Sequence, residues 1–522
     1  MPVKRFRGET YLRSPGGEIH LSLTINDDSV SESDDDSLHG RDMKPSEDNI
    51  RQLIAEAYQS LENGSVHTEV KIKEVCSLYS SLTSSEKLLF LHVLGTEFSA
   101  DHNSVVPLAA QVGAFHDIQD RESEAFLRLE ERLKAALTPK YHKLFMQIGR
   151  NDGGVKFLVD MRADILVILS QINASQEHYY LKSMCGVLKE MVALLFAPDY
   201  LQLTRVQWES PGDVIKKISE YEAINPIRSV DDLKRRFGPY RRCYIFTQSR
   251  MSSEPVIVLH TALTQEISSN IQTLINNDAG FSEFGAQSNG HFEDTSRITT
   301  AVFYSITSTQ KGLQGIEFGN YLIPRVISEL MQEFPRLRHI VSLSPLPGFR
   351  DWLVAELGKL KHLNQIGESA HTVLFTAAEL KNLAPFYGSA KDTCLDGLHK
   401  ALKDHSWLKM MDLVQVLKEP LMRLCIRYLY IEKRRGYALN PVANFHLRNG
   451  AMVWQLNWMA DPSQRGMNAA FGMMVNYRYI PGETEKYSRE YIENKLIEIS
   501  DNVLPYVKAL QEISRKDAHK KS

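Results

Sequence analysis

Residues 299–349 read TTAVFYSITSTQKGLQGIEFGNYLIPRVISELMQEFPRLRHIVSLSPLPGF, and this stretch decides the fold class. The β-forming run at 301–306 predicts a strand, which ends in a turn containing Gly312 and Gly315. Apolar residues then recur mostly at helical steps, before a second short strand predicted over His339–Leu343. Those apolar positions are Ile316, Tyr321, Leu322, Val326, Ile327 and Leu330. The order strand, glycine turn, helix, strand predicts a unit in the middle of an α/β sheet.

The glycine turn has two interpretations. The first N–H groups of a helix have no internal partner and the helix dipole adds positive charge, so such a turn is suited to bind an anion. However, the turn lacks the Lys-Ser/Thr of a nucleotide-binding P-loop and the spacing GxGxxG. Taken alone, it is more often an ordinary strand-to-helix turn.

Composition limits the class of protein. The chain has 522 residues, enough for two or three domains, with 43% apolar and 24% charged residues. A net charge of −3 gives no indication of nucleic acid or an anionic membrane as partner. The longest apolar run, Met191–Ala197, is far shorter than the ~18 residues of a membrane span. We therefore expect a globular protein without a transmembrane segment.

The cysteines are scattered, without CxxC spacing or clustering of the kind that binds metal. They are Cys76, Cys185, Cys243, Cys394 and Cys425. This distribution argues against structural zinc and a disulfide framework, and favours a reducing compartment.

Residues 1–47 are expected to form a disordered tail. The tract DDSVSESDDDS within them cannot bury enough apolar surface to fold. The basic start of the chain leaves a weak organelle transit signal as an alternative.

Residues 48–197 predict a helical bundle. Thr83-Ser84-Ser85-Glu86 has capping-box spacing before an apolar run. Further helices are expected at Glu122–Leu137, Gly154–Ile172 and His178–Phe196. An all-helical module ahead of a mixed domain is typical of an oligomerisation unit, and no site is evident in it.

Residues 198–522 predict the mixed α/β domain. Ser210 is expected to cap a helix with Pro211 at its first position, and Ser229 to start another. Residues 350–437 are predicted mostly helical, and a final helix is expected from Ser488 to about Ile513. Strands are expected at Arg242–Thr247, Pro255–His260, Ala451–Trp458 and Met473–Tyr479.

Two segments, SITSTQKGLQGIEFGNYLI…SLSPLPGF and NPVANFHLRNGAMVWQLNWMADPSQRG, closely resemble malonyl-CoA decarboxylases. The resemblance covers roughly residues 48–512. It implies a helical assembly domain followed by a catalytic domain similar to the GNAT acyltransferase fold. It also implies conversion of malonyl-CoA to acetyl-CoA and CO2, which controls the malonyl-CoA level and so fatty acid synthesis versus oxidation. The glycine turn would then hold the pyrophosphate arm of coenzyme A.

The resemblance also assigns site residues. The family's catalytic serine falls on Ser344 (proton acceptor or relay) and its histidine on His446 (proton donor). Glu317 and Tyr479 would lie near the acyl end. Ser342 is on the same strand face as Ser344, so spacing alone does not exclude it. The substrate loop falls on Gln314, Gly315, Ile316, Glu317, Phe318, Gly319 and Asn320.

The chemistry fits these residue types. Decarboxylation leaves an enolate, so the site must bind a carboxylate, stabilise charge on the thioester oxygen and deliver one proton to carbon. Histidine can carry that proton near neutral pH, and Ser344 is better suited to hydrogen bonding than to true deprotonation. The thioester acts as the electron sink, so no metal, biotin or pyridoxal cofactor is expected. Neither GxSxG nor HExxH is present.

The residues leave two other function classes open. One is an acyl-CoA-dependent acyltransferase, for which an acceptor channel and an amine base would be needed. The other is a non-catalytic coenzyme A-binding protein. The resemblance further implies a homo-oligomer, dimer or tetramer, formed through the helical domain, located in the mitochondrial matrix or the cytoplasm. The chain ends Lys520-Lys521-Ser522 rather than Ser-Lys-Leu, which makes a peroxisomal location less expected.

Overall fold

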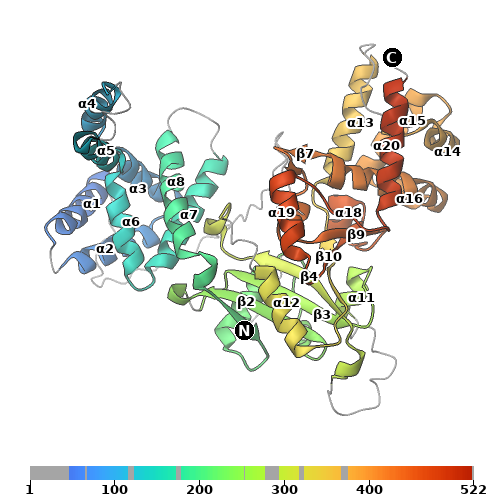
Figure 1. Cartoon of the computed structure of the whole chain (residues 1–522), viewed down its shortest axis with the longest axis horizontal. Coiled ribbons are helices and arrows are strands. Elements are labelled where there is room, and N and C mark those ends of the chain that lie inside the picture. Colours follow the sequence, from blue (N-terminus) through green and yellow to red (C-terminus); the bar gives the residue numbers. More distant parts are fainter. Residues whose placement is uncertain are drawn as a thin grey trace, which may run out of the picture. The chain divides into compact units, whose positions relative to one another are not determined.

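The computed structural model describes residues 46–64, 67–115, 123–171, 178–251, 253–276, 293–316, 322–365 and 374–519 (Figure 1). The tail expected at 1–47 lies almost wholly outside these residues. Glu47–Ser522 form one compact unit by their contacts. Within the described residues, no helix combines the length and apolar character needed to span a membrane.

The first part of the unit is helical, as expected, and its helices appear in blue to teal in Figure 1. The capping-box pair forms, because the Glu86 carboxylate accepts the Thr83 backbone N–H at 2.9 Å. Apolar stripes at helical spacing face inward, as in the first helix, where Ile50, Ile54 and Ala57 are fully buried. The helices are α1 (Glu47–Glu62), α2 (Thr68–Ser81), α3 (Ser84–Glu97), α4 (His102–Gly113), α5 (Glu124–Leu137), α6 (Lys140–Arg150), α7 (Gly154–Gln171) and α8 (Tyr179–Leu195).

The second part combines a sheet with helices. Its strands are β1 (Leu201–Val206), β2 (Arg241–Gln248), β3 (Ile257–Thr264), β4 (Thr300–Ser308), β5 (His339–Ser342), β6 (Ser344–Pro345), β7 (Lys433–Arg434), β8 (Tyr437–Ala438), β9 (Met452–Asn457) and β10 (Met474–Tyr479). Its helices are α9 (Gly212–Tyr221), α10 (Val230–Phe237), α11 (Ile271–Asn276), α12 (Leu322–Glu333), α13 (Phe349–Gln365), α14 (Ala377–Tyr387), α15 (Lys391–Asp404), α16 (Met411–Ile426), α17 (Pro441–Arg448), α18 (Gln464–Ala470), α19 (Thr484–Asn494) and α20 (Leu504–His519).

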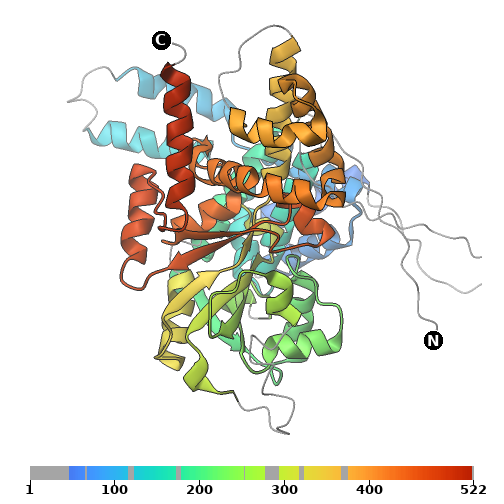
Figure 2. The ribbon, with the colours of Figure 1, turned by 90° about the vertical axis from the view of Figure 1, so that its right-hand side faces the viewer.

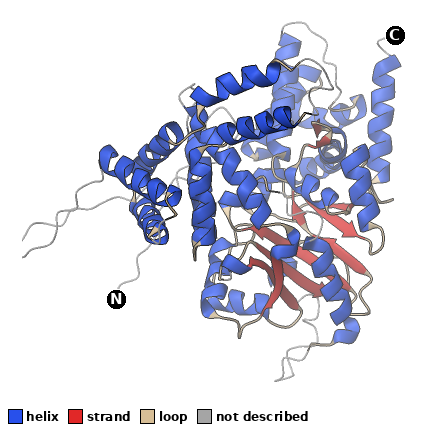
Figure 3. Cartoon of the chain, turned by 60° about the vertical axis from the view of Figure 1, so that its left-hand side comes forward, coloured by secondary structure: helices blue, strands red, loops and turns tan. Residues whose placement is uncertain are grey.

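The expected strand–turn–helix–strand unit is confirmed. Strands β4 and β5 are parallel, with Thr300 opposite His339 and Phe303 opposite Ser342, and α12 connects them. The large sheet, whose strands are red in Figure 3, runs in the order β1-β2-β3-β4-β5-β10-β6, with β9 also paired to β10. Its other pairs are antiparallel. Strand β4 therefore lies in the middle of the sheet, and the helical-plus-mixed fold class is confirmed.

Alternating side chains give the sheet two apolar faces. On one face, Phe246, Leu259 and Phe303 pack in the main core with α12. On the other face, residues such as Ile245 and Val258 pack beneath α9 and α10, and Val302 packs with α11. Alternate side chains point to opposite faces, and both faces are buried. The strands therefore have continuous apolar sequences rather than an alternation of apolar and polar residues. Figure 2 shows α13, α16 and α20 gathered on one side of the sheet.

Three local expectations were wrong. Ser210 is not the cap of α9: Pro211 occupies the N-cap position, and Ser210 Oγ instead accepts the Gln207 N–H at 3.0 Å. The final helix is two helices, because Lys495 adopts a left-handed conformation (φ 60°) and ends α19. Ile316 ends a turn, and α12 is described only from Leu322. The domain boundary expected at residue 198 stays a prediction.

Candidate active site

A cavity opens where two neighbouring strands separate. The pairing of β4 with β5 ends at Phe303 and Ser342, after which β4 continues, while Ser344 is paired with Val475 of β10, as β5 was before it. The cavity between the diverging strands has a volume of about 530 Å³, within the range of small-molecule sites. Its walls come from β4 and the following turn, from the segment after β5, and from the start of α17. The lining residues are Ile224, Ile257, Phe303, Tyr304, Ser305, Ile306, Ser308, Gln310, Lys311, Leu313, Gln314, Gly315, Ile316, Leu343, Ser344, Pro345, Pro441, Val442, Phe445 and His446.

Ser344 and His446 meet at the wall of this cavity. They are 102 residues apart in sequence, yet Ser344 Oγ lies 2.8 Å from His446 Nε2. Behind the histidine, Tyr479 OH lies 2.7 Å from His446 Nδ1. Among the described residues, no hydrogen bond joins Ser342 to the histidine; its Oγ accepts a hydrogen bond from Ser344 Oγ at 2.8 Å. Of the two serines on this strand, Ser344 is therefore the one beside both the histidine and the cavity.

The direction of these bonds fixes the histidine tautomer. A serine hydroxyl has one proton, and Ser344 donates it to Ser342. The bond between Ser344 and His446 then requires Nε2–H to donate to Ser344 Oγ. His446 Nδ1 is left as an acceptor, which the Tyr479 hydroxyl satisfies. The result is one directed chain of hydrogen bonds, Tyr479 to His446 to Ser344 to Ser342.

Burial keeps His446 neutral. The residue is 2% exposed, and loss of hydration lowers its pKa to about 3. The Tyr477 ring stacks on the imidazole, with centroids 4.4 Å apart and an interplanar angle of 18°. Burial likewise raises the pKa of Tyr479, so its phenol stays protonated. At neutral pH the cluster therefore carries no charge of its own.

Helix α17 is fixed against the serine segment at its first turn. Asn440 caps the helix by accepting the Ala443 N–H at 2.8 Å, and Pro441 follows at the first position. The Asn440 side chain also donates to the Pro347 carbonyl at 2.9 Å. The Tyr428 hydroxyl donates to the same carbonyl at 3.0 Å. One capping residue thus sets the spacing between the helix that carries His446 and the chain that follows Ser344.

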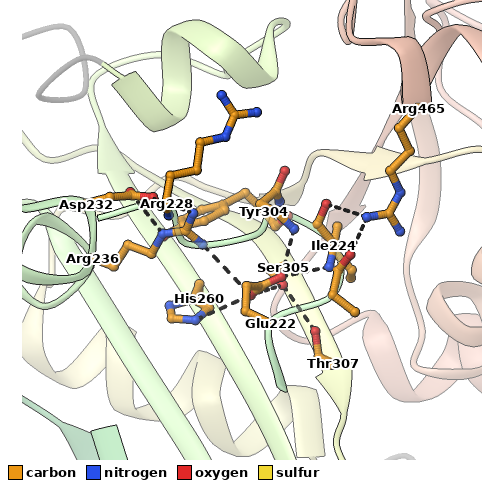
Figure 4. A network of polar contacts seen from close by, with 12 residues as sticks. Glu222, Ile224, Arg228, Asp232, Arg236, His260, Tyr304, Ser305, Thr307 and Arg465 are labelled. Carbon is orange, nitrogen blue, oxygen red and sulfur yellow. Dashed lines mark hydrogen bonds and ion pairs between the residues drawn. The ribbon is translucent and has the colours of Figure 1, made fainter. Parts of the chain in front are cut away.

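Ile224 also lines the cavity, and it is held by the buried carboxylate of Glu222 (Figure 4). The Glu222 side chain is fully buried, and its carboxylate accepts the N–H groups of Ile224 (2.9 Å) and Asn225 (2.8 Å) and the Ser305 hydroxyl (2.7 Å). Arg465 donates to the carbonyls of Ala223 and Ile224, the latter at 3.0 Å. These bonds hold Ile224 in the cavity wall.

His260 lies beside the same carboxylate. Its Nε2 is 3.5 Å from Glu222 Oε2, and within the described residues neither ring nitrogen has a hydrogen-bond partner. Burial lowers the pKa of His260 to about 4 despite the neighbouring carboxylate, so the ring is neutral at pH 7 and the contact is not an ion pair.

The expected substrate loop is only partly described. Gln314, Gly315 and Ile316 line the cavity, whereas Glu317, Phe318, Gly319 and Asn320 lie outside the described residues. Tyr479 is not among the lining residues and reaches the cavity only through His446. The roles expected for all these residues stay predictions.

Tyr477 and Glu222 gave no signal of a role in the site. Tyr477 stacks on His446 and Glu222 accepts the Ser305 hydroxyl, and both of these partners are far away along the chain. Only Asn440-Pro441 has a readable pattern, that of a helix start.

Comparison with known proteins gives consistent matches. A family model described as the malonyl-CoA decarboxylase C-terminal domain matches residues 199–517, and the corresponding N-terminal domain model matches residues 98–196. The mitochondrial malonyl-CoA decarboxylase of the goose Anser anser anser is 42% identical over 88% of this chain and 87% of its own length. The Rattus norvegicus protein of the same description is 43% identical, over 88% and 89%.

Solved structures agree in fold. The malonyl-CoA decarboxylase of Rhodopseudomonas palustris has a TM-score of 0.70 at 29% identity, covering 87% of this chain and 98% of that one. The Agrobacterium vitis enzyme has a TM-score of 0.68 at 26% identity, covering 89% and 99%. Family models, relatives and folds agree over both halves, and the chain therefore belongs to the malonyl-CoA decarboxylase family.

Proposed function

We propose that this protein converts malonyl-CoA to acetyl-CoA and CO2, with Ser344 and His446 as its catalytic residues. The observation that carries the assignment of the site is the 2.8 Å contact between Ser344 Oγ and His446 Nε2 at the wall of a cavity, in a chain of this family. In an acyl-CoA complex, the acyl group lies against these two residues, and the coenzyme extends along β4 toward the turn at Lys311–Ile316. Lys311 lines the cavity and supplies positive charge at the phosphate end.

The reaction begins with loss of the carboxylate. The C–C bond to the carboxylate breaks, CO2 leaves, and the electron pair moves into the thioester to form the enolate of acetyl-CoA. The Ser344 hydroxyl turns from Ser342 to the developing oxyanion and stabilises it, an interaction typically worth ~3 kcal/mol of barrier. Because the cavity wall is mostly apolar, that hydrogen bond is stronger than it would be in water.

One proton completes the reaction. The Ser344 O–H bond breaks as its proton passes to the enolate carbon, and Ser344 Oγ takes the Nε2 proton of His446, which faces it. The Tyr479 hydroxyl holds Nδ1 as acceptor and so keeps Nε2 protonated. Water returns the proton after acetyl-CoA leaves, so each turnover consumes one proton. The thioester itself accepts the electron pair, and the proposed chemistry uses no metal, biotin or pyridoxal.

The proposal extends to assembly and location. A homo-oligomer formed through the helical region is supported by exposed apolar side chains on α4 and α5: Val106 is 69% exposed, Leu127 52% and Leu137 53%. The relatives described as mitochondrial support an intracellular, mitochondrial location for this protein. Light scattering tests the assembly, and cell fractionation tests the location.

The test measures acetyl-CoA release from malonyl-CoA by purified protein with no acceptor amine present. We expect turnover by the parent and a loss of ~10²-fold or more in kcat for Ser344→Ala, because the positioned hydroxyl is lost. Ser342→Ala is the matched control, since the hydrogen bonds of that hydroxyl in the described part of the chain are with Ser344 and the Tyr477 N–H. It should retain most of the activity. A greater loss in Ser342→Ala than in Ser344→Ala would contradict the assignment, and a parent that turns over only with an amine acceptor would be an acyltransferase.

A further inference from the structure

We propose that Arg162, on helix α7 of the N-terminal helical region, is a positioning residue of the coenzyme A site. It holds the turn Lys311–Ile316 from behind and sets the orientation of the peptide groups that meet the phosphates. This inference rests on the proposed function, because it takes the ligand of the turn to be a coenzyme A thioester.

The contacts of Arg162 join the two halves of the chain. The side chain is buried (residue 3% exposed) and donates to the carbonyl oxygens of Gly312 and Gln314, the latter at 2.8 Å. Both residues are about 150 positions away along the chain, and Gln314 lines the cavity. In the described part of the chain, its hydrogen-bond partners are carbonyls and not carboxylates. A guanidinium fork that is buried to bind two carbonyls of one turn fixes the geometry of that turn.

The backbone of the turn also lies directly against α7. Gly312 is buried, and a Cβ atom at this position would overlap the carbonyl oxygen of Val159, one helical turn before Arg162. Only glycine permits so close an approach. The turn is therefore packed onto the helical region as well as hydrogen-bonded to it.

The contacts of Arg162 also orient an N–H group toward the ligand, because they fix the peptide between Gln314 and Gly315. In a trans peptide the C=O and N–H groups point in opposite directions, so the Gly315 N–H points away from the Gln314 carbonyl that Arg162 holds. Gly315 has φ +75° and lines the cavity. Its surroundings are cationic, since a Cβ placed on it would be 3.8 Å from Lys189 Nζ of α8. A directed backbone N–H beside an ammonium group suits a phosphate oxygen.

The inference predicts that a change at Arg162 affects KM for one substrate and not for another. Arg162 acts on the phosphate end and not on the acyl end, where Ser344 and His446 lie. Arg162→Lys keeps the charge but loses the fork that spans two carbonyls. We expect KM for malonyl-CoA to rise ~10-fold or more, the loss expected for one charge-assisted hydrogen bond. KM for malonyl-pantetheine, which has no nucleotide or phosphate, should stay near the parent value, as should kcat for both substrates.

The matched control is Arg423→Lys. Arg423 is buried to a similar extent (5% exposed) and donates to the Leu374 carbonyl at 2.7 Å and to Glu379, but it does not line the cavity. It should lower the unfolding temperature without changing the ratio of the two KM values. Equal increases of KM for both substrates in Arg162→Lys would mean a general structural role and would overturn the proposal, as would no change in either.

Binding of coenzyme A itself separates this inference from the proposed function. Calorimetry with free coenzyme A should show Kd weakened ~10-fold in Arg162→Lys and unchanged in Arg423→Lys. A parent protein without decarboxylase turnover would overturn the proposed function, while this measurement would still decide the role of Arg162. An unchanged Kd overturns the inference whether or not the parent is active.

Discussion

Two buried histidines lie at this sheet in different situations. His446 is at the cavity wall, has a hydrogen-bond partner at each ring nitrogen, and has no charged group among its bond partners. His260 is fully buried beside the Glu222 carboxylate, has no hydrogen-bond partner among the described residues, and does not line the cavity. Both have a pKa lowered by burial, to about 3 and about 4.

The difference shows what marks the reactive residue. A lowered pKa is common to both histidines, so it does not identify a catalytic group here. What distinguishes His446 is a defined tautomer, set by Tyr479, together with access to the cavity through Ser344. Hydrogen-bond direction and exposure to the ligand, rather than burial, separate a proton-transfer residue from a residue of the core.

The largest expected effect tests this contrast directly. His446→Gln should lower kcat by ~10²–10⁴-fold, the usual contribution of positioned proton transfer. His260→Gln should leave kcat close to the parent value once the folded fraction is matched by circular dichroism. Steady-state kinetics on both variants decides the matter. A comparable loss in His260→Gln would mean that the Glu222 cluster takes part in the chemistry.

A smaller effect on stability and KM is expected when the carboxylate beside His260 is replaced. Glu222→Gln loses at least one of the three hydrogen bonds that the carboxylate accepts, and should lower the free energy of unfolding by roughly 1–3 kcal/mol. Because Ile224 then moves in the cavity wall, KM for malonyl-CoA should rise while kcat changes little. Urea unfolding and kinetics give the two values.

Glu379→Gln is the control for that variant. It removes a carboxylate paired with Arg423, away from the cavity lining. Loss of stability without a change in KM is expected. If KM rises equally in both variants, the effect of Glu222 is not specific to the wall segment.

The third expected effect is on the pH dependence of stability. In the folded state His260 binds a proton only near pH 4, whereas in the unfolded chain it does so near its ordinary value of ~6.5. Between these values the unfolded state holds more protons than the folded state. The contribution of His260 to stability is therefore fully present above pH 6.5 and is lost as the pH falls toward 4. His260→Asn should make the free energy of unfolding less steep in that window by about 1.4 kcal/mol per pH unit. Parallel curves for variant and parent would show that His260 is protonated alike in both states.

Local patterns in the sequence predicted local structure well. The capping box at Thr83–Glu86 formed, and the alternation of β-forming residues and glycines gave β4, α12 and β5 in the correct order and in the middle of the sheet. These features depend on residues close together in the chain. The final helix was wrong for the complementary reason: charged amphipathic residues continue through Lys495, and nothing local shows that it turns left-handed.

Only the site residues that lie in the family's sequence motifs could be predicted. Ser344 and His446 were named from the resemblance, but their 2.8 Å contact depends on tertiary folding across 102 residues. Arg162 could not be identified as part of the site, because a buried arginine that binds carbonyls has no fixed spacing to its partners. Glu222 binds N–H groups two and three residues ahead, but such a local turn does not show that the segment lies at the cavity. Such residues become visible only when the backbone they hold is known.

The irregular pairing of β4 with β3 has a consequence for insertions and deletions. Phe303 is opposite Thr261 and Ser305 is opposite His260, so Tyr304 is one residue more than the partner strand supplies. In a regular strand, losing one residue turns every later side chain to the other face. Here, a chain shortened by Tyr304 alone would keep Phe303 on the α12 face and Ser305 beside Glu222, with both flanks still in register. The β-bulge at Tyr304 thus allows strand β4 to lose one residue without a change of register, at the position where the cavity begins.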